Sequence, residues 1–96
     1  MRESEFPGKR TVLVAEHQAV AGMWLEDVLT DAGFAVDGPH PSCEAAIAAL
    51  AGSRSDYAVV NVDLSQGPCF ALACALRMAD VPFVLLSGSA RVLPAF

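Results

Sequence analysis

Four short apolar runs recur along this 96-residue sequence, and a segment with helical periodicity separates each run from the next. The runs are TVLVA at 11–15, FAVDG at 34–38, YAVVNV at 57–62 and VPFVLLS at 81–87. Strands that are buried on both faces of a sheet have short, nearly continuous apolar sequences of this kind. Their alternation with helices predicts an α/β fold, in which a parallel sheet is doubly wound and carries helices on both faces.

The first intervening segment predicts an amphipathic helix at about 18–32. One broad face of this helix collects its apolar side chains: Val20, Ala21, Trp24, Leu25, Val28, Leu29 and Ala32. We expect this face, with Trp24 on it, to pack into the core. Gly33 follows at the position where helices commonly end in the left-handed conformation.

Two further helices are predicted on the same grounds. One covers about 43–51, with Ser42 as its N-cap and with Ile47 and Leu50 turned inward. The other covers about 69–79 and begins next to Pro68, which suits a first helical turn. Its inward side chains are expected to be Phe70, Leu72, Ala73 and Leu76.

Length and charge limit the possible functions. A chain of this length forms one domain, which we place at 11–96 after a flexible lead-in at 1–10. Eleven acidic residues against six basic ones argue against nucleic acid and against an anionic membrane surface as partners. No apolar run approaches the roughly 18 residues of a membrane span.

The three cysteines, Cys43, Cys69 and Cys74, do not form a metal-binding pattern. They contain no CxxC pair, and no histidine is spaced to complete a zinc site. An odd number of cysteines without a signal peptide predicts reduced thiols and a cytoplasmic location.

Candidate site residues follow from the predicted topology. In parallel α/β sheets, binding and chemistry take place at the carboxyl ends of the strands. Glu16 and His17 follow the first strand, Asn61 and Asp63 lie at the end of the third, and Ser87 ends the fourth.

These segments resemble the receiver domain of two-component response regulators. VLVAEH resembles the family's VLVVDD, YAVVNVDLSQG resembles DLVLLDVNLPGG, and VPFVLLSG resembles the family's fourth strand with its Ser or Thr. The resemblance covers about residues 11 to 90. It implies a flavodoxin-like receiver fold with strand order 2-1-3-4. The family's fifth strand-helix unit, with its lysine, is missing because the sequence ends before it.

The resemblance also assigns roles, and several residues depart from them. The family's phospho-accepting aspartate falls on Asn61, and its two acidic metal-holding residues fall on Glu16 and His17. The family's switch hydroxyl falls on Ser87, which retains it. Asp63 lies where the family contributes a backbone carbonyl to the metal.

The departures alter the expected chemistry. The family's reaction is attack by a carboxylate on a phosphohistidine with Mg²⁺ assistance, and it requires an anionic oxygen that the Asn61 amide does not offer. Mg²⁺ prefers oxygen ligands, of which Glu16 would supply a single carboxylate. We therefore expect no required cofactor and no enzymatic activity. A hydrogen bond among Glu16, His17 and Asn61 is expected in place of the metal.

The resulting interpretation is a receiver-like module that is not phosphorylated conventionally and acts by protein contact. A histidine kinase or another signalling protein would be its partner. Two alternatives stay open, namely phospho-acceptance by Asp63 and a purely structural dimerisation module. A nucleotide site is disfavoured, because the first strand-helix turn, AEHQAVAG, has no glycine-rich phosphate cradle.

The missing fifth unit makes the apolar strand at 82–86 an edge of the sheet, which is a hazard for aggregation. A second copy, the chain's own tail or a partner would cover it. We predict a homodimer through the 82–96 region.

Overall fold

The structure is a computed structural model that describes residues 9–52, 55–61, 63–64, 67–86 and 92–93. Of 63–64, 67–68 and 92–93 it describes the backbone alone. Most of the predicted lead-in, 1–8, lies outside the described residues, as does Ser87.

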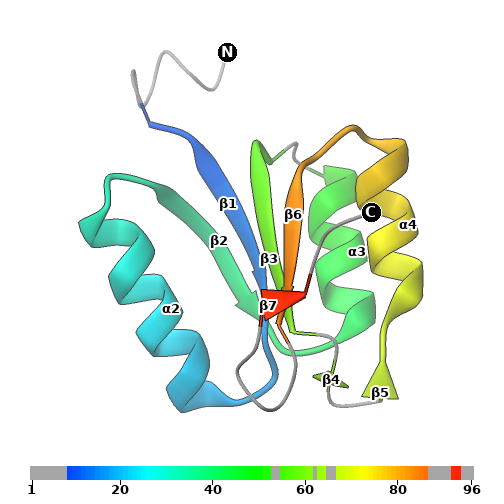
Figure 1. Ribbon diagram of the computed structural model, residues 1–96, viewed down its shortest axis with the longest axis horizontal. Coiled ribbons are helices and arrows are strands. Elements are labelled where there is room, and N and C mark those ends of the chain that lie inside the picture. Colours follow the sequence, from blue (N-terminus) through cyan, green and yellow to red (C-terminus); the bar gives the residue numbers. More distant parts are fainter. Residues whose placement is uncertain (1–8, 53–54, 62, 65–66, 87–91, 94–96) are drawn as a thin grey trace.

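Four parallel strands form the body of the sheet, in the order β2-β1-β3-β6 (Figure 1). They are β1 (Thr11–Ala15), β2 (Ala35–His40), β3 (Tyr57–Asn61) and β6 (Phe83–Leu86). The predicted order of 2-1-3-4 is thereby confirmed. β1 lies between two neighbours and is the most buried strand, because helices cover both of its faces.

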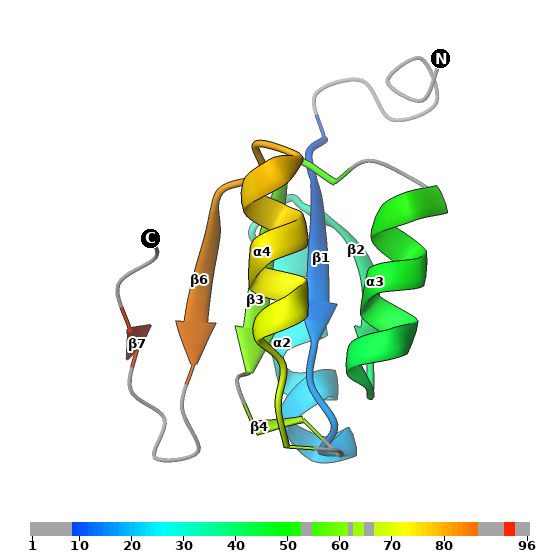
Figure 2. The ribbon, with the colours of Figure 1, turned by 90° about the vertical axis from the view of Figure 1, so that its right-hand side faces the viewer.

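Three helices cover the sheet unequally (Figures 1 and 2). The helix α2 (Ala19–Asp31) lies alone on one face, against β1 and β2. The helices α3 (Cys43–Gly52) and α4 (Phe70–Met78) lie side by side on the other face. Helices are thus present on both faces, as the alternating pattern predicted.

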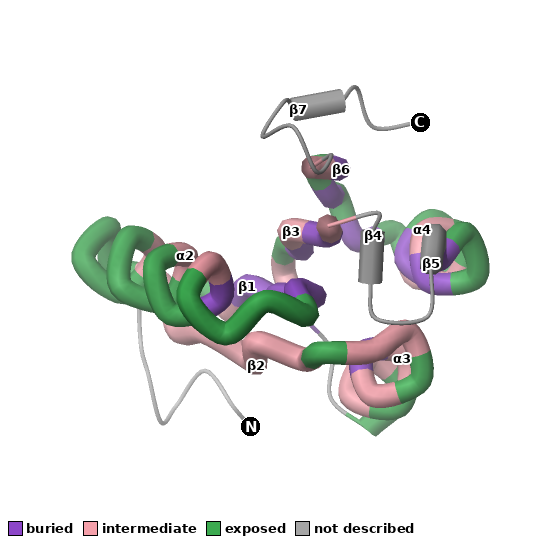
Figure 3. The backbone as a smooth tube through the Cα atoms, turned by 90° about the horizontal axis from the view of Figure 1, so that it is seen from below, coloured by how far each residue is buried: buried purple, intermediate pink, exposed green. Residues whose placement is uncertain are grey.

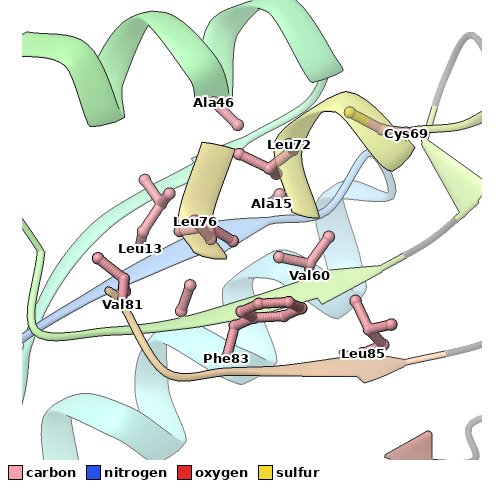
Figure 4. Close-up of a cluster of buried hydrophobic side chains, with 11 residues drawn as sticks. Leu13, Ala15, Ala46, Val60, Cys69, Leu72, Leu76, Val81, Phe83 and Leu85 are labelled. Atoms are coloured by element: carbon pink, nitrogen blue, oxygen red, sulfur yellow. The ribbon is translucent and has the colours of Figure 1, made fainter. Parts of the chain in front are cut away.

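The main core lies between the sheet and the α3–α4 layer (Figure 4). Leu13 and Val60 from the sheet meet Leu72 and Leu76 from α4, and all four side chains are fully buried. Ile47 and Leu50 of α3 pack against this cluster, as expected. Phe70, by contrast, is exposed, because it starts α4 on the side away from the sheet.

Helix ends follow the sequence signals closely. The Ser42 hydroxyl accepts a hydrogen bond from the amide of Ala45, at 3.1 Å, and caps α3. Gly33 adopts φ +98° after α2. The amides of Gly33 and Phe34 bond to the carbonyls of Thr30 and Leu29, which is the Schellman arrangement.

The expected burial of Trp24 is wrong. Its residue is 63% exposed, and Val20 on the same helix is 82% exposed. The reason is that α2 packs mainly on β1 and β2, and within the described residues no helix lies beside it. The buried residue of α2 is Gly22. A Cβ added at this position would lie 2.7 Å from Pro39 Cγ.

The outer edge of the sheet is partly covered by the chain's own tail. A short strand, β7 (Val92–Leu93), pairs antiparallel with Leu86 and Leu85 of β6. A second copy, a partner or the chain's own tail was expected to cover this edge. The tail covers it at Leu85 and Leu86. The segment after β3 contains a small antiparallel pair, β4 (Asp63–Leu64) with β5 (Gly67–Pro68).

The expectation of three reduced cysteines is also wrong, because Cys43 and Cys69 form a disulfide. Their Cα atoms are 5.7 Å apart, although 26 positions separate them in sequence. Both residues stand where a helix begins, and α3 and α4 begin at the same edge of the sheet because each follows a parallel strand. Cys74 is free and exposed.

Within the described ranges, no helix is long and apolar enough to cross a membrane.

Candidate functional site

The candidate site lies at the carboxyl edge of β1 and β3. These strands are parallel neighbours, and Ala15 is in register with Val60. Glu16 follows Ala15 and Asn61 follows Val60, so the register places their side chains together although 45 positions separate them.

A hydrogen bond joins the two residues directly. The Asn61 side-chain amide, Nδ2, donates to Glu16 Oε1 at 2.8 Å. Glu16 is 4% exposed, and burial of an ionised carboxylate is costly unless donors surround it. The expected hydrogen bond between Glu16 and Asn61 is therefore present, and it gives the buried carboxylate one of its donors.

The second oxygen of Glu16 binds the start of α2. The backbone amide of Gln18, the N-cap residue of that helix, donates to Glu16 Oε2 at 3.0 Å. A carboxylate at a helix N-terminus is also favoured by the helix dipole. Glu16 thus links the end of β3 to the start of α2.

His17 takes part more loosely. Its Nδ1 atom lies 3.8 Å from Glu16 Oε2, which is beyond hydrogen-bond distance and makes an ion pair only when the ring is protonated. His17 is exposed, whereas Glu16 is buried. Of the expected network among three residues, the structure therefore brings Glu16 and Asn61 into contact and leaves His17 at the rim.

The position of Glu16 is fixed on the β2 side as well. Its backbone amide donates to the carbonyl of His40 at 2.9 Å. The His40 imidazole Nε2 in turn lies 2.9 Å from Oδ1 of Asp37, three positions earlier on the same strand. Side chain and backbone of Glu16 are thus both held by neighbouring elements.

The two other candidate residues are less defined. The backbone of Asp63 lies in β4, and its side chain is outside the described residues. Ser87 is outside them entirely. Their roles as an acidic-pocket residue and as a switch hydroxyl stay predictions.

The described residues do not fit a Mg²⁺ site. They contain no cluster of three or more histidine, cysteine or acidic side chains that could hold a metal ion. Among the side chains that the structure describes at this edge, the Glu16 carboxylate accepts hydrogen bonds from Asn61 and Gln18, one on each oxygen. Mg²⁺ demands near-octahedral oxygen coordination and is usually bound through one or two carboxylates together with waters.

Sequence reasoning missed one residue that aligns the site from the opposite edge of the sheet. Asp56 Oδ2 accepts a hydrogen bond from the amide of Thr11 at 2.8 Å, and the Asp56 amide donates to the Thr11 carbonyl at 2.9 Å. This pair joins the start of β1 to the start of β3. It fixes the register that later brings Glu16 and Asn61 together. An aspartate just before a strand was the available signal.

Comparison by sequence finds no match. No protein-family model matches it, and no curated protein matches it by sequence.

Solved structures do match. The PhyR receiver domain of Erythrobacter litoralis aligns with a TM-score of 0.76 at 22% identity, over 83% of this chain and 64% of that one. The HemR receiver domain of Leptospira biflexa gives 0.74 at 24% identity, over 86% and 68%. A CheY-like receiver domain from Methylobacillus flagellatus gives 0.74 at 24%, over 84% and 71%. The chain spans less than two thirds of the PhyR domain's length. Strand order, helix placement and these matches together show that the chain has the fold of a response-regulator receiver domain.

Proposed function

We propose that this chain is a receiver-like module of two-component signal transduction that does not accept phosphate in the conventional way and acts by protein contact. The observation that carries the proposal is the hydrogen bond between Asn61 and Glu16 at the carboxyl edge. A neutral amide stands at the end of β3, where the resemblance expects the carboxylate nucleophile. An amide nitrogen or carbonyl does not supply the anionic oxygen that attack on phosphorus requires.

The surroundings of Asn61 support the same proposal. Glu16, the carboxylate that would hold a metal beside the nucleophile, is satisfied by protein donors on both oxygens. A metal at Glu16 would have to share these oxygens with the two hydrogen bonds. The edge is thereby held in one arrangement by contacts within the chain, which suits recognition by a partner.

The proposed partner is a histidine kinase or another signalling protein. The net charge of −5 disfavours nucleic acid and anionic membranes. A cytoplasmic location belongs to the proposal and stays a prediction. Disulfides are rare in that compartment, so the redox state of Cys43 and Cys69 in the cell bears on it directly.

A second candidate function is a dimerisation module. Apolar side chains exposed on α2 and on the uncovered half of the sheet favour it, among them Val20, Trp24 and Val84. The predicted homodimer through 82–96 is part of this candidate. The two functions are compatible, because a dimer of receiver-like modules also presents its carboxyl edges to partners.

Intact-mass spectrometry after incubation with acetyl phosphate and Mg²⁺ tests the proposal. We expect the wild-type chain to stay unmodified. An Asp63→Asn variant is the matched control for the remaining phospho-acceptor alternative, and Asn61→Asp restores a carboxylate at the end of β3. Phosphorylation of the wild type that disappears in Asp63→Asn would overturn the proposal and establish Asp63 as the acceptor.

The Asn61→Asp variant then reports on the rest of the edge. Gain of a phosphoryl group by this variant would show that Asn61 alone blocks the reaction. An unmodified variant would show that further parts of the reactive site are absent, with His17 as the first residue to replace.

A further inference from the structure

The disulfide at the carboxyl edge joins the starts of two helices. Cys43 is the first residue of α3, and Cys69 is the N-cap residue of α4. Figure 3 looks onto this edge and shows the two helices side by side on one face of the sheet. The two residues differ in exposure, since Cys43 is partly buried and Cys69 is only 6% exposed. A reagent in the solvent therefore reaches Cys43 more readily.

The two helix starts differ as well. The Ser42 hydroxyl caps α3 by accepting a hydrogen bond from the Ala45 amide, and Glu44 adds a negative charge to the first turn. Among the described residues, no side chain caps α4 and no acidic side chain lies in its first turn. The first amides of a helix have no partner within the helix and favour negative charge nearby. The start of α4 is therefore the better place for a negatively charged sulfur.

These differences bear on thiol–disulfide exchange. In this reaction a thiolate attacks one sulfur of the bond, and the other sulfur leaves as a thiolate, faster when that thiolate is stabilised. The accessible sulfur is that of Cys43, and the sulfur beside the uncapped amides of α4 is that of Cys69. Once released, a Cys69 thiolate is placed to accept a hydrogen bond from those amides, as an N-cap side chain does. The fold thus favours breakage of the bond in one direction.

We propose that the Cys43–Cys69 bond is a site of reversible exchange with a low-molecular-weight thiol of the glutathione class. In the first step the thiolate attacks Cys43, a mixed disulfide forms there, and Cys69 leaves as a thiolate. In the second step another thiolate attacks the sulfur of the bound small thiol, and Cys43 leaves. Two small thiols are thereby oxidised to one disulfide, and their two electrons reduce the protein bond. Their protons pass to the protein thiolates or to solvent, and oxidation of the protein reverses both steps.

The third cysteine does not supply the attacking thiol. Cys74 lies five positions after Cys69, which places the two side chains about 140° apart around the helix axis. Cys74 is exposed and Cys69 is buried, in agreement with that rotation. The attacking thiol therefore comes from outside the chain.

The location proposed for the chain agrees with such an exchange. Cytoplasmic disulfides are usually transient and belong to catalytic or redox-sensing pairs. A structural disulfide resists reduction by the glutathione pool, whereas a labile one does not. The inference goes beyond the proposed function, because it depends neither on the absence of phosphorylation nor on a dimer.

The exchange acts on the segment that follows the candidate site. Asn61 ends β3, β4 begins at Asp63, and β5 ends at Pro68, directly before Cys69. The intact bond ties the end of this short antiparallel pair to the start of α3. Reduction removes the tie, and a two-stranded pair is marginally stable at best on its own. Reduction is therefore expected to loosen the backbone next to Asn61.

Redox titration in glutathione buffers, followed by rapid alkylation and intact-mass spectrometry, tests the proposal. A Cys74→Ser background ensures that every alkylated thiol comes from the bonded pair. We expect both thiols to appear at glutathione ratios where its reduced and oxidised forms are both abundant. A bond that stays oxidised in excess reduced glutathione would be structural, and the proposal would be wrong. Loss of the helical circular dichroism signal on reduction would also overturn it, since the bond would then open only by unfolding.

Peptide mapping identifies the sulfur that is attacked. A short pulse of glutathione is stopped by alkylation, and trypsin then separates the two cysteines at Arg54. We expect glutathione on the peptide that contains Cys43 and the alkyl label on the peptide that contains Cys69. The opposite distribution would contradict the proposed direction of the exchange.

Two charge variants test the role of the α4 start. Ala71 is exposed in the first turn of α4, and Ala71→Glu adds an acidic side chain there. We expect reduction by glutathione to slow about threefold, because the added carboxylate competes for the amides and repels the thiolate. Met78→Glu is the matched control, since Met78 ends the same helix and is 88% exposed. Equal slowing in both variants would show that net charge, and not the helix start, sets the rate.

Hydrogen exchange with mass spectrometry measures the consequence for the edge. Reduction of the wild type is expected to speed amide exchange in β4, β5 and the first turn of α4 by about tenfold, and to leave β1 unchanged. The double variant Cys43→Ser/Cys69→Ser is the control and is expected to exchange at one rate with and without reductant. Unchanged exchange in β4 and β5 of the reduced wild type would overturn the link between the bond and the candidate site.

Discussion

Asn61 and Glu16 lie on neighbouring strands, and the amide of the first binds the buried carboxylate of the second at 2.8 Å. The contact pairs the neutral Asn61 amide with the Glu16 carboxylate. An aspartate at position 61 would instead bring a second carboxylate close to that of Glu16. Stability and reactivity at this edge are therefore linked through one side chain.

Asn61→Asp is expected to lower the free energy of unfolding at neutral pH by about 1–3 kcal/mol, because it replaces a donor with a like charge beside Glu16. Asn61→Ala removes the donor without adding charge and is expected to cost less. Urea unfolding of the three proteins gives the comparison. Mg²⁺ is expected to restore part of the loss in Asn61→Asp and none in Asn61→Ala. Equal stability of Asn61→Asp and the wild type would contradict the assigned role of the hydrogen bond.

The disulfide between Cys43 and Cys69 is expected to contribute about 2–4 kcal/mol to stability, since it closes a loop between residues 26 positions apart. The double variant Cys43→Ala/Cys69→Ala removes it without leaving an unpaired thiol at either position. Unfolding with and without reductant measures the effect. Cys74→Ser is the control and should respond to reductant as the wild type does. An unfolding midpoint of the wild type that does not change with reductant would count against the disulfide.

Gly22 and Gly52 give a matched pair of substitutions for the packing of α2. A Cβ at Gly22 would lie 2.7 Å from Pro39 Cγ, and a Cβ at Gly52 would have nothing within 4 Å. Gly22→Ala is expected to destabilise by about 1–3 kcal/mol through overpacking. Gly52→Ala is expected to be neutral or slightly stabilising, because alanine has the higher helix propensity. Thermal unfolding of both variants decides, and equal midpoints would mean that α2 shifts freely on β2.

Asp80 is a site for stabilisation. It follows α4 with φ +57°, and its amide and that of Val81 close the helix on the carbonyls of Arg77 and Leu76. Glycine adopts this left-handed conformation without a Cβ penalty, so Asp80→Gly is expected to gain about 0.5–1 kcal/mol. Asp27→Gly inside α2 is the opposite control and should lose a similar amount. Denaturant midpoints measure both, and a loss at position 80 would show that the aspartate side chain has its own stabilising contact.

The strands were predictable because a buried parallel strand leaves a signature in its own residues. TVLVA coincides with β1, Thr11–Ala15, and the ends of the other strands differ by at most two positions. The strand order came from the resemblance to receiver domains. The juxtaposition of Glu16 and Asn61 followed from that order, since Glu16 follows β1 and Asn61 ends β3, its parallel neighbour. The hydrogen bond from the Gln18 backbone amide to Glu16 was not predictable, because a backbone amide leaves no signal in the sequence.

The expectations that proved wrong concern which segments pack against a helix or strand, and not where that helix or strand lies in the sequence. Periodicity identified α2 and its broad apolar face, but it cannot tell whether one or two neighbours cover that face. Trp24 was assigned to the core for this reason and is exposed. Cysteine spacing likewise carries no information about helix starts that meet at one edge, so the bond between Cys43 and Cys69 was not foreseen. The pairing of β7 with β6 depends on where the tail turns back, which its two residues do not encode.

The bond between Cys43 and Cys69 encloses β3, and with it Asn61, in a covalent ring that starts at α3 and ends at α4. A ring of this kind limits how far the starts of the two helices can separate when a partner approaches the carboxyl edge. Oxidation would then favour partners that accept this edge as it stands, at little cost in conformational entropy. Reduction would widen the set of shapes that the edge can offer.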